Sequence, residues 1–305
     1  MDKMKTGSTQ HSVDEFVRQY GLDNYVLDLL QAIACDNEKI KDLLISDYLG
    51  NPLSAVEEEE LLDYFIMNSI FSAATVANPA TSVVTELLYS QSKHPFAIDQ
   101  YFLESKSGKA IRSRLLRVEE YIHELIEDYR KDGDVLIGNL GGGPGRDVCD
   151  VFSSYYQDSS NVVAITVERD EMAIKRGTRI AEEAGVDDKI HFSRTSFMRF
   201  GPEKKFNIIL LVGVLCSLPP ETCVAVLTVA SQMMADGGCI MVSNVTPLMV
   251  QEDPFTYFIM EKIVGWKLIF KTDGVMKDIL NRAGLTWKKS FTDDYGFHLM
   301  AIGTK

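Results

Sequence analysis

The fold is decided by residues 135–147, which read Val-Leu-Ile-Gly-Asn-Leu-Gly-Gly-Gly-Pro-Gly-Arg-Asp. The stretch begins as an apolar run typical of a buried strand, continues as a turn packed with glycine, and leads into a helical pattern. Glycine adopts backbone dihedrals that are closed to other residues, and because it has no Cβ a ligand can approach the backbone closely. The stretch therefore predicts a strand, turn and helix that bind a nucleotide or nucleoside.

A second signal comes from the next strand-like run, residues 162–167, which is followed by Glu168. Glu168 lies roughly 20 residues beyond the glycine turn, where a carboxylate at a strand end accepts hydrogen bonds from ribose hydroxyls. The turn and the carboxylate therefore indicate the same kind of ligand.

Outward from this unit, strand-like and helical patterns alternate. The strand-like runs are 135–140, 162–167, 190–193, 206–212 and 239–245, and the helical ones are 146–156, 170–184 and 220–234. Such alternation predicts a parallel sheet covered on both faces. After a helix at 272–281, the runs 285–290 and 297–303 close a short polar turn, so they must be antiparallel. We expect an α/β fold with a doubly wound, mainly parallel seven-stranded sheet and an antiparallel last strand.

The chain before this alternation predicts helices throughout. Capping-box patterns occur at Ser12-x-x-Glu15 and Ser54-x-x-Glu57, and a long apolar periodicity covers 107–130. Residues 1–128 hold 11 basic and 22 acidic residues, whereas 129–305 hold 20 and 22. We therefore expect an all-α domain at 1–128, preceding an α/β domain at 129–305.

Composition excludes several classes of protein. The 305 residues carry a net charge of −13, which argues against nucleic acid or an anionic membrane as the main partner. The longest strongly apolar run, residues 208–215, is far short of the roughly 20 residues of a membrane-spanning helix, and the first residues do not resemble a secretory signal. The five cysteines never approach a CxxC spacing. We expect a cytoplasmic protein without a metal site.

The glycine turn does not match a dinucleotide fingerprint, because Arg146 stands where GxGxxG requires its third glycine. It fits the spacing Asn139-x-Gly141-x-Gly143-x-Gly145 instead. With Glu168 and the antiparallel tail, residues 133–305 resemble the class I S-adenosylmethionine-dependent methyltransferases. The helical addition resembles the members that act on small molecules. The resemblance implies a Rossmann-like methyltransferase fold, S-adenosylmethionine as cofactor and S-adenosylhomocysteine as product.

The resemblance also implies how each part of the cofactor is held. The glycines face its methionine portion, Glu168 with Arg169 holds the ribose, residues 195–197 line the adenine, and residues 212–213 close the site. The implied cofactor-binding residues are Asn139, Gly141, Gly142, Gly143, Gly145, Glu168, Arg169, Thr195, Ser196, Phe197, Val212 and Gly213. Asn139, Thr195 and Asn207 depart from the family, which usually has acidic residues at these positions. Asn and Thr can still accept hydrogen bonds.

Catalysis requires little acid–base chemistry if the cofactor is a sulfonium. Its methyl group is already activated, so positioning of the acceptor is the main expected device, and no catalytic residue is assigned. His191 and His298 lie in strand-like runs and are expected to be structural. The helical domain is expected to cover the carboxyl ends of the strands, to form a homodimer, or both. The expected contacts to the small-molecule acceptor are His94, Tyr101, Arg112, Asn244 and Tyr295.

Two alternatives remain open. An aminopropyl-transferring synthase of the polyamine or nicotianamine type shares the Gly141–Gly145 turn and the Val167-Glu-x-Asp170 strand end. Polyamine synthases, however, need carboxylates after strands three and four, where this chain has Thr195-Ser196 and Val212-Gly213. The second alternative is a regulatory module that binds S-adenosylmethionine without turnover.

Overall fold

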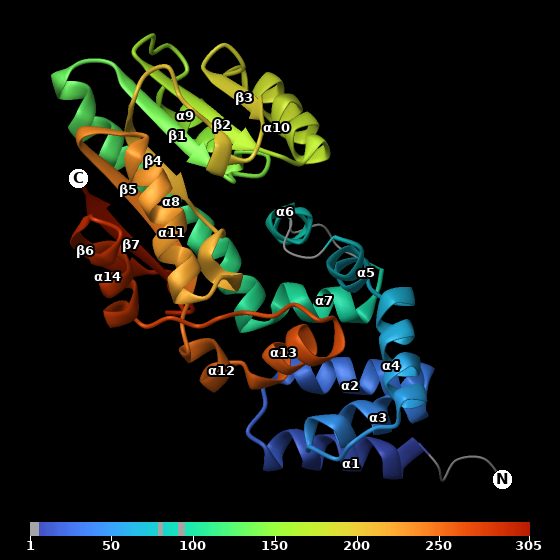
Figure 1. Ribbon diagram of the computed structural model, residues 1–305. Helices are drawn as coiled ribbons and strands as arrows, with labels where there is room; N and C mark the ends of the chain where they lie inside the picture. Colours follow the sequence, from blue (N-terminus) through green and yellow to red (C-terminus); the bar gives the residue numbers. More distant parts are fainter. Residues whose placement is uncertain (1–5, 79–81, 91–94) are drawn as a thin grey trace. The chain divides into compact units, whose positions relative to one another are not determined.

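The computed structural model describes residues 6–78, 82–90 and 95–305, and the chain divides into two compact units (Figure 1). The helical unit comprises the residues up to Lys109 together with Met249–Lys267, and the α/β unit comprises Ala110–Leu248 with Leu268–Lys305. The division falls inside helix α8 (Lys106–Tyr129), whereas the sequence suggested a boundary between 128 and 129. The reason is packing: Val118 and Ile122 of α8 are fully buried in the core of the α/β unit.

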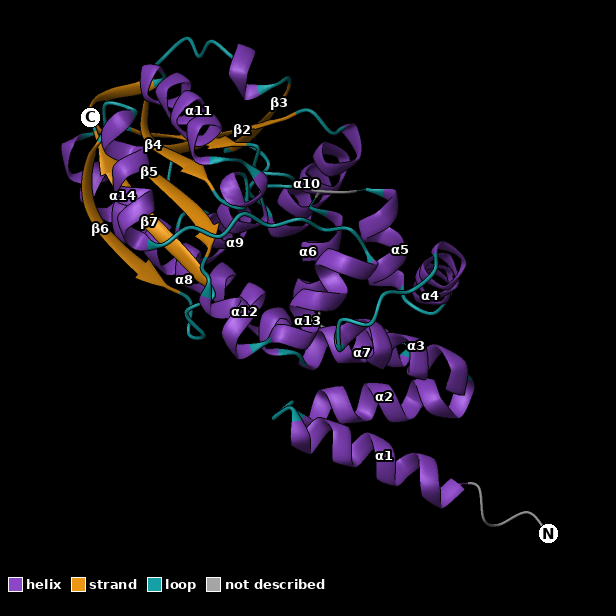
Figure 2. Ribbon diagram, turned by 60° about the horizontal axis from the view of Figure 1, so that its bottom comes forward, coloured by secondary structure: helices purple, strands orange, loops and turns teal. Residues whose placement is uncertain are grey.

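The α/β unit is built on one sheet of seven strands in the order β3-β2-β1-β4-β5-β7-β6 (Figures 1 and 2). The first five strands pair in parallel, and β7 runs antiparallel to both of its neighbours. This confirms the predicted mixed sheet with an antiparallel last strand. The strands are β1 (Val135–Leu140), β2 (Val162–Glu168), β3 (Ile190–Arg194), β4 (Phe206–Leu211), β5 (Met234–Val245), β6 (Thr286–Thr292) and β7 (His298–Thr304).

Helices cover both faces of the sheet. One core layer contains buried residues of α8, α9 (Arg146–Tyr155) and α10 (Glu171–Ala184), and the other contains those of α11 (Pro220–Gln232) and α14 (Asp273–Arg282). Successive side chains of β7 point to opposite faces of the sheet. Met300 and Ile302 enter the first core layer, whereas Leu299 and Ala301 enter the second. Short 3-10 turns at Arg130–Asp132, Phe197–Arg199 and Leu215–Ser217 complete the unit.

The helical unit consists of short helices. They are α1 (Thr6–Gln19), α2 (Asn24–Asp36), α3 (Glu38–Tyr48), α4 (Ala55–Met67), α5 (Ile70–Ala77), α6 (Val83–Ser90), α7 (Ala97–Glu104), α12 (Leu248–Glu252), α13 (Pro254–Phe258) and the π-helical turn η4 (Ile259–Ile263). The predicted capping box at Ser54 is present, since its side chain accepts from the backbone of Glu57 and the Glu57 carboxylate accepts from the backbone of Ser54. The one predicted at Ser12 is wrong, because α1 begins at Thr6 and continues through that position.

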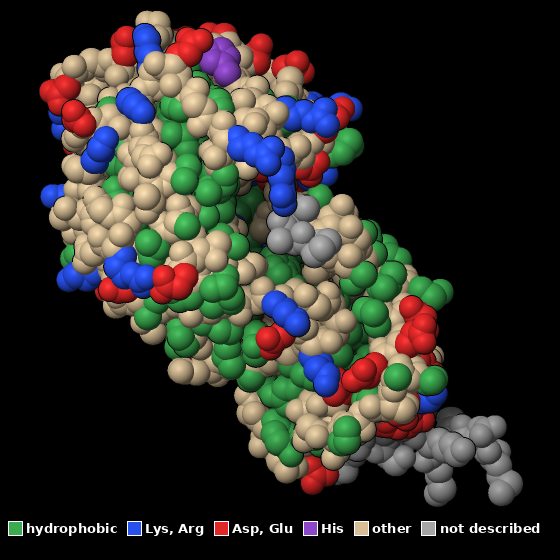
Figure 3. All heavy atoms as spheres, viewed as in Figure 1, with side chains coloured by type: hydrophobic (Ala, Val, Ile, Leu, Met, Phe, Trp, Pro, Cys, Tyr) green, Lys and Arg blue, Asp and Glu red, His purple; other side chains and the backbone are tan. Residues whose placement is uncertain are grey.

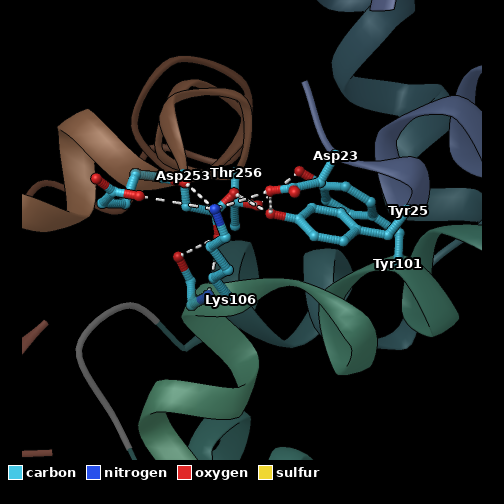
Figure 4. Close-up of polar contacts among 8 residues, drawn as sticks. Asp23, Tyr25, Tyr101, Lys106, Asp253 and Thr256 are labelled. Atoms are coloured by element: carbon cyan, nitrogen blue, oxygen red, sulfur yellow. Dashed lines mark hydrogen bonds and ion pairs between the residues drawn. The ribbon is translucent and has the colours of Figure 1, made fainter. Parts of the chain in front are cut away.

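A buried polar network fixes the segment 249–267 within the helical unit (Figure 4). The carboxylate of Asp253, only 2% exposed, accepts hydrogen bonds from the backbone and hydroxyl of Ser107 at 2.8 and 2.7 Å. It also accepts from Thr256 Oγ1 at 2.7 Å and from Tyr25 at 3.0 Å. Lys106 pairs with Asp23 at 3.1 Å beside this network. Segments distant in the sequence are thus held together by one buried carboxylate.

No described helix has the length and apolarity needed to cross a membrane. On the face shown in Figure 3, Lys and Arg side chains are interspersed with Asp and Glu side chains.

Candidate functional site

The glycine turn after β1 has a backbone that only glycine accommodates well. Gly141, Gly143 and Gly145 have φ of +67°, +57° and +68°, in the left-handed region. Gly142 is required for a different reason, because an ideal Cβ there would lie 2.4 Å from the side-chain amide of Asn139. A Cβ on Gly145 would lie 2.9 Å from Thr166 Oγ1. The turn therefore brings backbone without side chains to the end of β1, packed closely on the buried side chains of Asn139 and Thr166.

Buried polar groups lie beneath the turn. Asn139 is fully buried and donates from Nδ2 to Asp147 Oδ1 at 3.1 Å. Burial raises the pKa of Asp147 to about 6, against the opposing effects of hydrogen bonds from the Val148 backbone and from Asn139. Asp147, in the first turn of α9, thus places a buried carboxylate against the amide of Asn139. Among the described residues, Asn139 Oδ1 and Thr166 Oγ1 are buried without a hydrogen-bond partner.

Glu168, at the end of β2, lies directly against the glycine turn. Its Oε2 accepts from the backbone of Gly143 at 3.1 Å. Its Oε1 accepts from the backbone of Arg169 at 2.7 Å and of Asp170 at 3.0 Å. The side chain of Arg169 is exposed. The Glu168 carboxylate therefore faces the turn across the end of the strand.

The ends of β3 and β4 add the remaining predicted residues. The backbone of Thr195 donates to Glu168 O at 3.1 Å, and Ser196 precedes the 3-10 turn that begins at Phe197. The ring of Phe197 lies 3.5 Å from an ideal Cβ on Gly141. Val212 packs against the core, and Gly213, with φ of +76°, donates from its backbone to Ser243 Oγ at 2.8 Å. All of these residues lie at the carboxyl edge of the sheet, defined here as the edge at which β1 to β5 end.

Helix α8 contributes a cation to this edge that the sequence analysis missed. Arg114, which is 8% exposed, has its Nη1 3.9 Å from the position of an ideal Cβ on Gly213. Its positive charge acts to lower the pKa of Asp147 and also that of His298, the first residue of β7. Nothing in the helical pattern of residues 107–130 distinguishes Arg114 from its neighbours, because its role depends on the packing of α8 against the sheet.

The predicted acceptor contacts belong to both units. His94 lies outside the described residues. Tyr101, 3% exposed in the helical unit, forms a hydrogen bond between its hydroxyl and Thr256 Oγ1 at 2.6 Å. Arg112 is half-buried on α8, and Tyr295, in the turn between β6 and β7, is 37% exposed.

The side chain of Asn244, the last of the predicted acceptor contacts, is buried and hydrogen-bonded to neighbouring segments of the chain. It is 1% exposed and donates from Nδ2 to the carbonyls of Val245 at 2.7 Å and Ile269 at 3.2 Å. Its Oδ1 accepts from Lys271 Nζ at 3.0 Å, and Lys271 also donates to Leu215 O and Ile269 O. Burial lowers the pKa of Lys271. Hydrogen bonds of Asn244 and Lys271 thus connect the turn after β4 and the end of β5 with the chain before α14.

The model of a family described as "Putative methyltransferase" matches residues 90–305. No curated protein matches the chain significantly.

Solved structures share the fold at low sequence identity. A possible exported protein from Bordetella parapertussis is 14% identical, with a TM-score of 0.70 over 90% of this chain and 96% of that chain. The magnesium protoporphyrin IX methyltransferase of Synechocystis PCC 6803, determined with bound S-adenosylmethionine, is 13% identical, with a TM-score of 0.52 over 81% and 96%. A protein from Nostoc punctiforme PCC 73102, described as a putative O-methyltransferase, is 12% identical, with a TM-score of 0.53 over 100% of both chains. At these identities the likeness establishes the fold alone.

Proposed function

The chain belongs to the methyltransferase family whose model matches residues 90–305, and we propose that it transfers the methyl group of S-adenosylmethionine to a small molecule. The observation that carries the proposal is the contact between Glu168 and Gly143, which places a carboxylate at a strand end beside the glycine turn. A ribose needs a hydrogen-bond acceptor at that place, and the rest of a nucleoside cofactor needs backbone without side chains.

The residues present fit this cofactor. The glycine turn, which has no side chains between 141 and 143, would face its methionine portion. Glu168 would accept hydrogen bonds from the ribose hydroxyls, and residues 195–197 would line the adenine. Val212 and Gly213 would close the site from the end of β4. Asn139 is buried beneath Gly142, so its part would be to support the turn from below.

When bound, S-adenosylmethionine supplies a methyl group that is already activated for in-line displacement. The chain's own contribution is then to hold the acceptor against that group and to exclude water, which we take as the main source of rate enhancement. The net charge of −13 and the mixed surface support a small-molecule acceptor rather than a nucleic acid or a membrane. Covering of the site or homodimerisation by the helical unit, and a cytoplasmic location, stay predictions.

The test is methyl transfer. The purified protein, given methyl-tritiated S-adenosylmethionine and a protein-free extract of small metabolites, should move the label into the extract. Glu168→Ala should lose most of this transfer at a subsaturating cofactor concentration. Glu182→Ala, an exposed carboxylate on α10, is the matched control and should keep it. Transfer by Glu168→Ala at the wild-type rate would contradict the ribose assignment, and cofactor binding without any transfer would favour a non-catalytic binding module.

A further inference from the structure

His298 lies at the carboxyl edge of the sheet. It is the first residue of β7, and because β7 is antiparallel it pairs with Val245, the last residue of β5. Met300 and Ile302, two and four residues further along β7, enter the core layer that contains α8. His298 therefore points to the same face of the sheet, the face on which Arg114 lies close to Gly213.

Asp293 holds the imidazole in one orientation. This carboxylate is 2% exposed, and its Oδ2 accepts from the backbone of His298 and contacts Nδ1 of the ring at 2.9 Å. Its Oδ1 accepts from the backbone of Tyr295 at 2.7 Å. A carboxylate can only accept, so Nδ1 carries the hydrogen and, in the neutral ring, the lone pair is on Nε2.

Nε2 is the nitrogen of the ring that Asp293 does not hold. It makes no hydrogen bond within the described residues, so the neutral ring keeps a lone pair there. His298 is 6% exposed and lies at the carboxyl edge of the sheet. A buried histidine with a carboxylate behind one nitrogen and a lone pair on the other is arranged to accept a proton.

Burial is the main cause that lowers the pKa of His298. The hydrogen bond and the negative charge of Asp293 oppose this effect, and the positive charge of Arg114 on α8 adds to it. The other charged pair nearby, Arg117 on α8 with Asp294 in the β6–β7 turn, is exposed. The Ser113 hydroxyl on α8 accepts from the backbone of Asp294 at 2.9 Å, which fixes the turn that carries Asp293.

We propose that His298 is the general base for methyl transfer and that the acceptor is an alcohol or a phenol. This inference rests on the proposed function. The acceptor oxygen attacks the methyl carbon, the carbon–sulfur bond breaks with its electron pair going to sulfur, and the acceptor proton moves to Nε2. The products are an ether, neutral S-adenosylhomocysteine and an imidazolium that releases its proton to water. Asp293 is a positioning residue in this step.

Arg114 favours a hydroxyl acceptor. Its fixed positive charge at the edge repels an ammonium group and stabilises the negative charge that develops on an oxygen losing its proton. A carboxylate or thiolate acceptor would need no base at all.

The first test needs neither cofactor nor acceptor. The full chain labelled with ¹⁵N-histidine is titrated by NMR, with His298→Gln used to assign the resonance. We expect the Nδ1-protonated, neutral tautomer at pH 7, and a change in its titration in Asp293→Asn. A ring protonated on Nε2 at pH 7 would overturn the proposal, whatever the fate of the proposed function.

The second test is kinetic. Wild type, His298→Gln and Asp293→Asn are assayed with methyl-tritiated S-adenosylmethionine against catechol, benzyl alcohol, benzoate, thiophenol and benzylamine. Methylation should fall on the hydroxyl compounds. In His298→Gln, kcat should fall by about 10²-fold to 10⁴-fold, the rise of rate with pH should disappear, and cofactor affinity should be unchanged. His191→Gln, an exposed histidine on β3, is the matched control and should behave as wild type. Wild-type kcat in His298→Gln, or methylation confined to benzoate, would contradict the proposal.

Discussion

Replacing Gly142 with alanine should destabilise the α/β unit by a steric clash that the structure locates. An ideal Cβ at this position lies 2.4 Å from three atoms of the Asn139 side chain, Cγ, Nδ2 and Oδ1. Gly142 is not among the glycines with positive φ, so backbone strain plays no part. Asn139 is fully buried and donates to Asp147, so it can move only by breaking that hydrogen bond.

The size of the effect follows from these two contributions. Overpacking of a buried site costs about 1–3 kcal/mol, and loss of a buried hydrogen bond to a carboxylate costs about 1–3 kcal/mol. We therefore expect Gly142→Ala to lower the free energy of unfolding by roughly 2–6 kcal/mol. Urea unfolding followed by far-ultraviolet circular dichroism measures this as a lower transition midpoint.

Two further variants isolate the cause. Gly274, in α14, has no atom within 4 Å of an ideal Cβ and no positive φ, so Gly274→Ala should leave the midpoint nearly unchanged. Removing the obstacle in Asn139→Ala/Gly142→Ala should cost less than the sum of the single substitutions. A Gly142→Ala protein as stable as wild type would refute the steric argument.

Three other predictions concern individual side chains. Burial raises the pKa of Glu119 to about 8, and repulsion from the carboxylates of α9 raises it further in the same direction. The stability that this shift contributes is fully present below pH 4.5 and is lost as pH rises through 8. Glu119→Gln should therefore be more stable than wild type by about 2 kcal/mol at pH 9, a value reduced for partial exposure, and equal denaturation midpoints there would disprove it. Ser54→Ala removes the capping box with Glu57 and should cost about 1 kcal/mol; unchanged hydrogen exchange in α4 would count against this. Asp99, fully buried, accepts from Ser69 Oγ at 2.6 Å and from two backbone groups at the start of α5, so Asp99→Ala should cost about 2–4 kcal/mol; proteolysis at the wild-type rate near α5 would contradict it.

The sequence predicts the parts of the fold that depend on local pattern. The turn at residues 141, 143 and 145 can be recognised in the sequence, because few residues other than glycine adopt a backbone with positive φ. Alternating strands and helices predict the sheet, and the short turn before β7 predicts its antiparallel direction. These features are encoded within a few residues of one another.

What the sequence does not predict depends on contacts between distant segments. The boundary inside α8 follows from burial of Val118 against the sheet, and the return of 249–267 to the helical unit depends on the buried Asp253. Helical periodicity predicts that Arg114 lies on a helix, but not that this helix places it beside Gly213. The sequence places His298 in a strand-like run, but its contact with Asp293 depends on the fold of the turn between β6 and β7.

The most direct test of the central claim is calorimetric titration of the purified chain with S-adenosylmethionine, S-adenosylhomocysteine and NAD in parallel. The account predicts that the first two bind with one site per chain and that NAD does not. It also predicts that Glu168→Ala weakens both by about tenfold to a hundredfold, the value of one or two hydrogen bonds to a charged group. Binding of NAD instead, or of S-adenosylmethionine with full affinity to Glu168→Ala, would contradict the assignment of the glycine turn and Glu168 as the cofactor site.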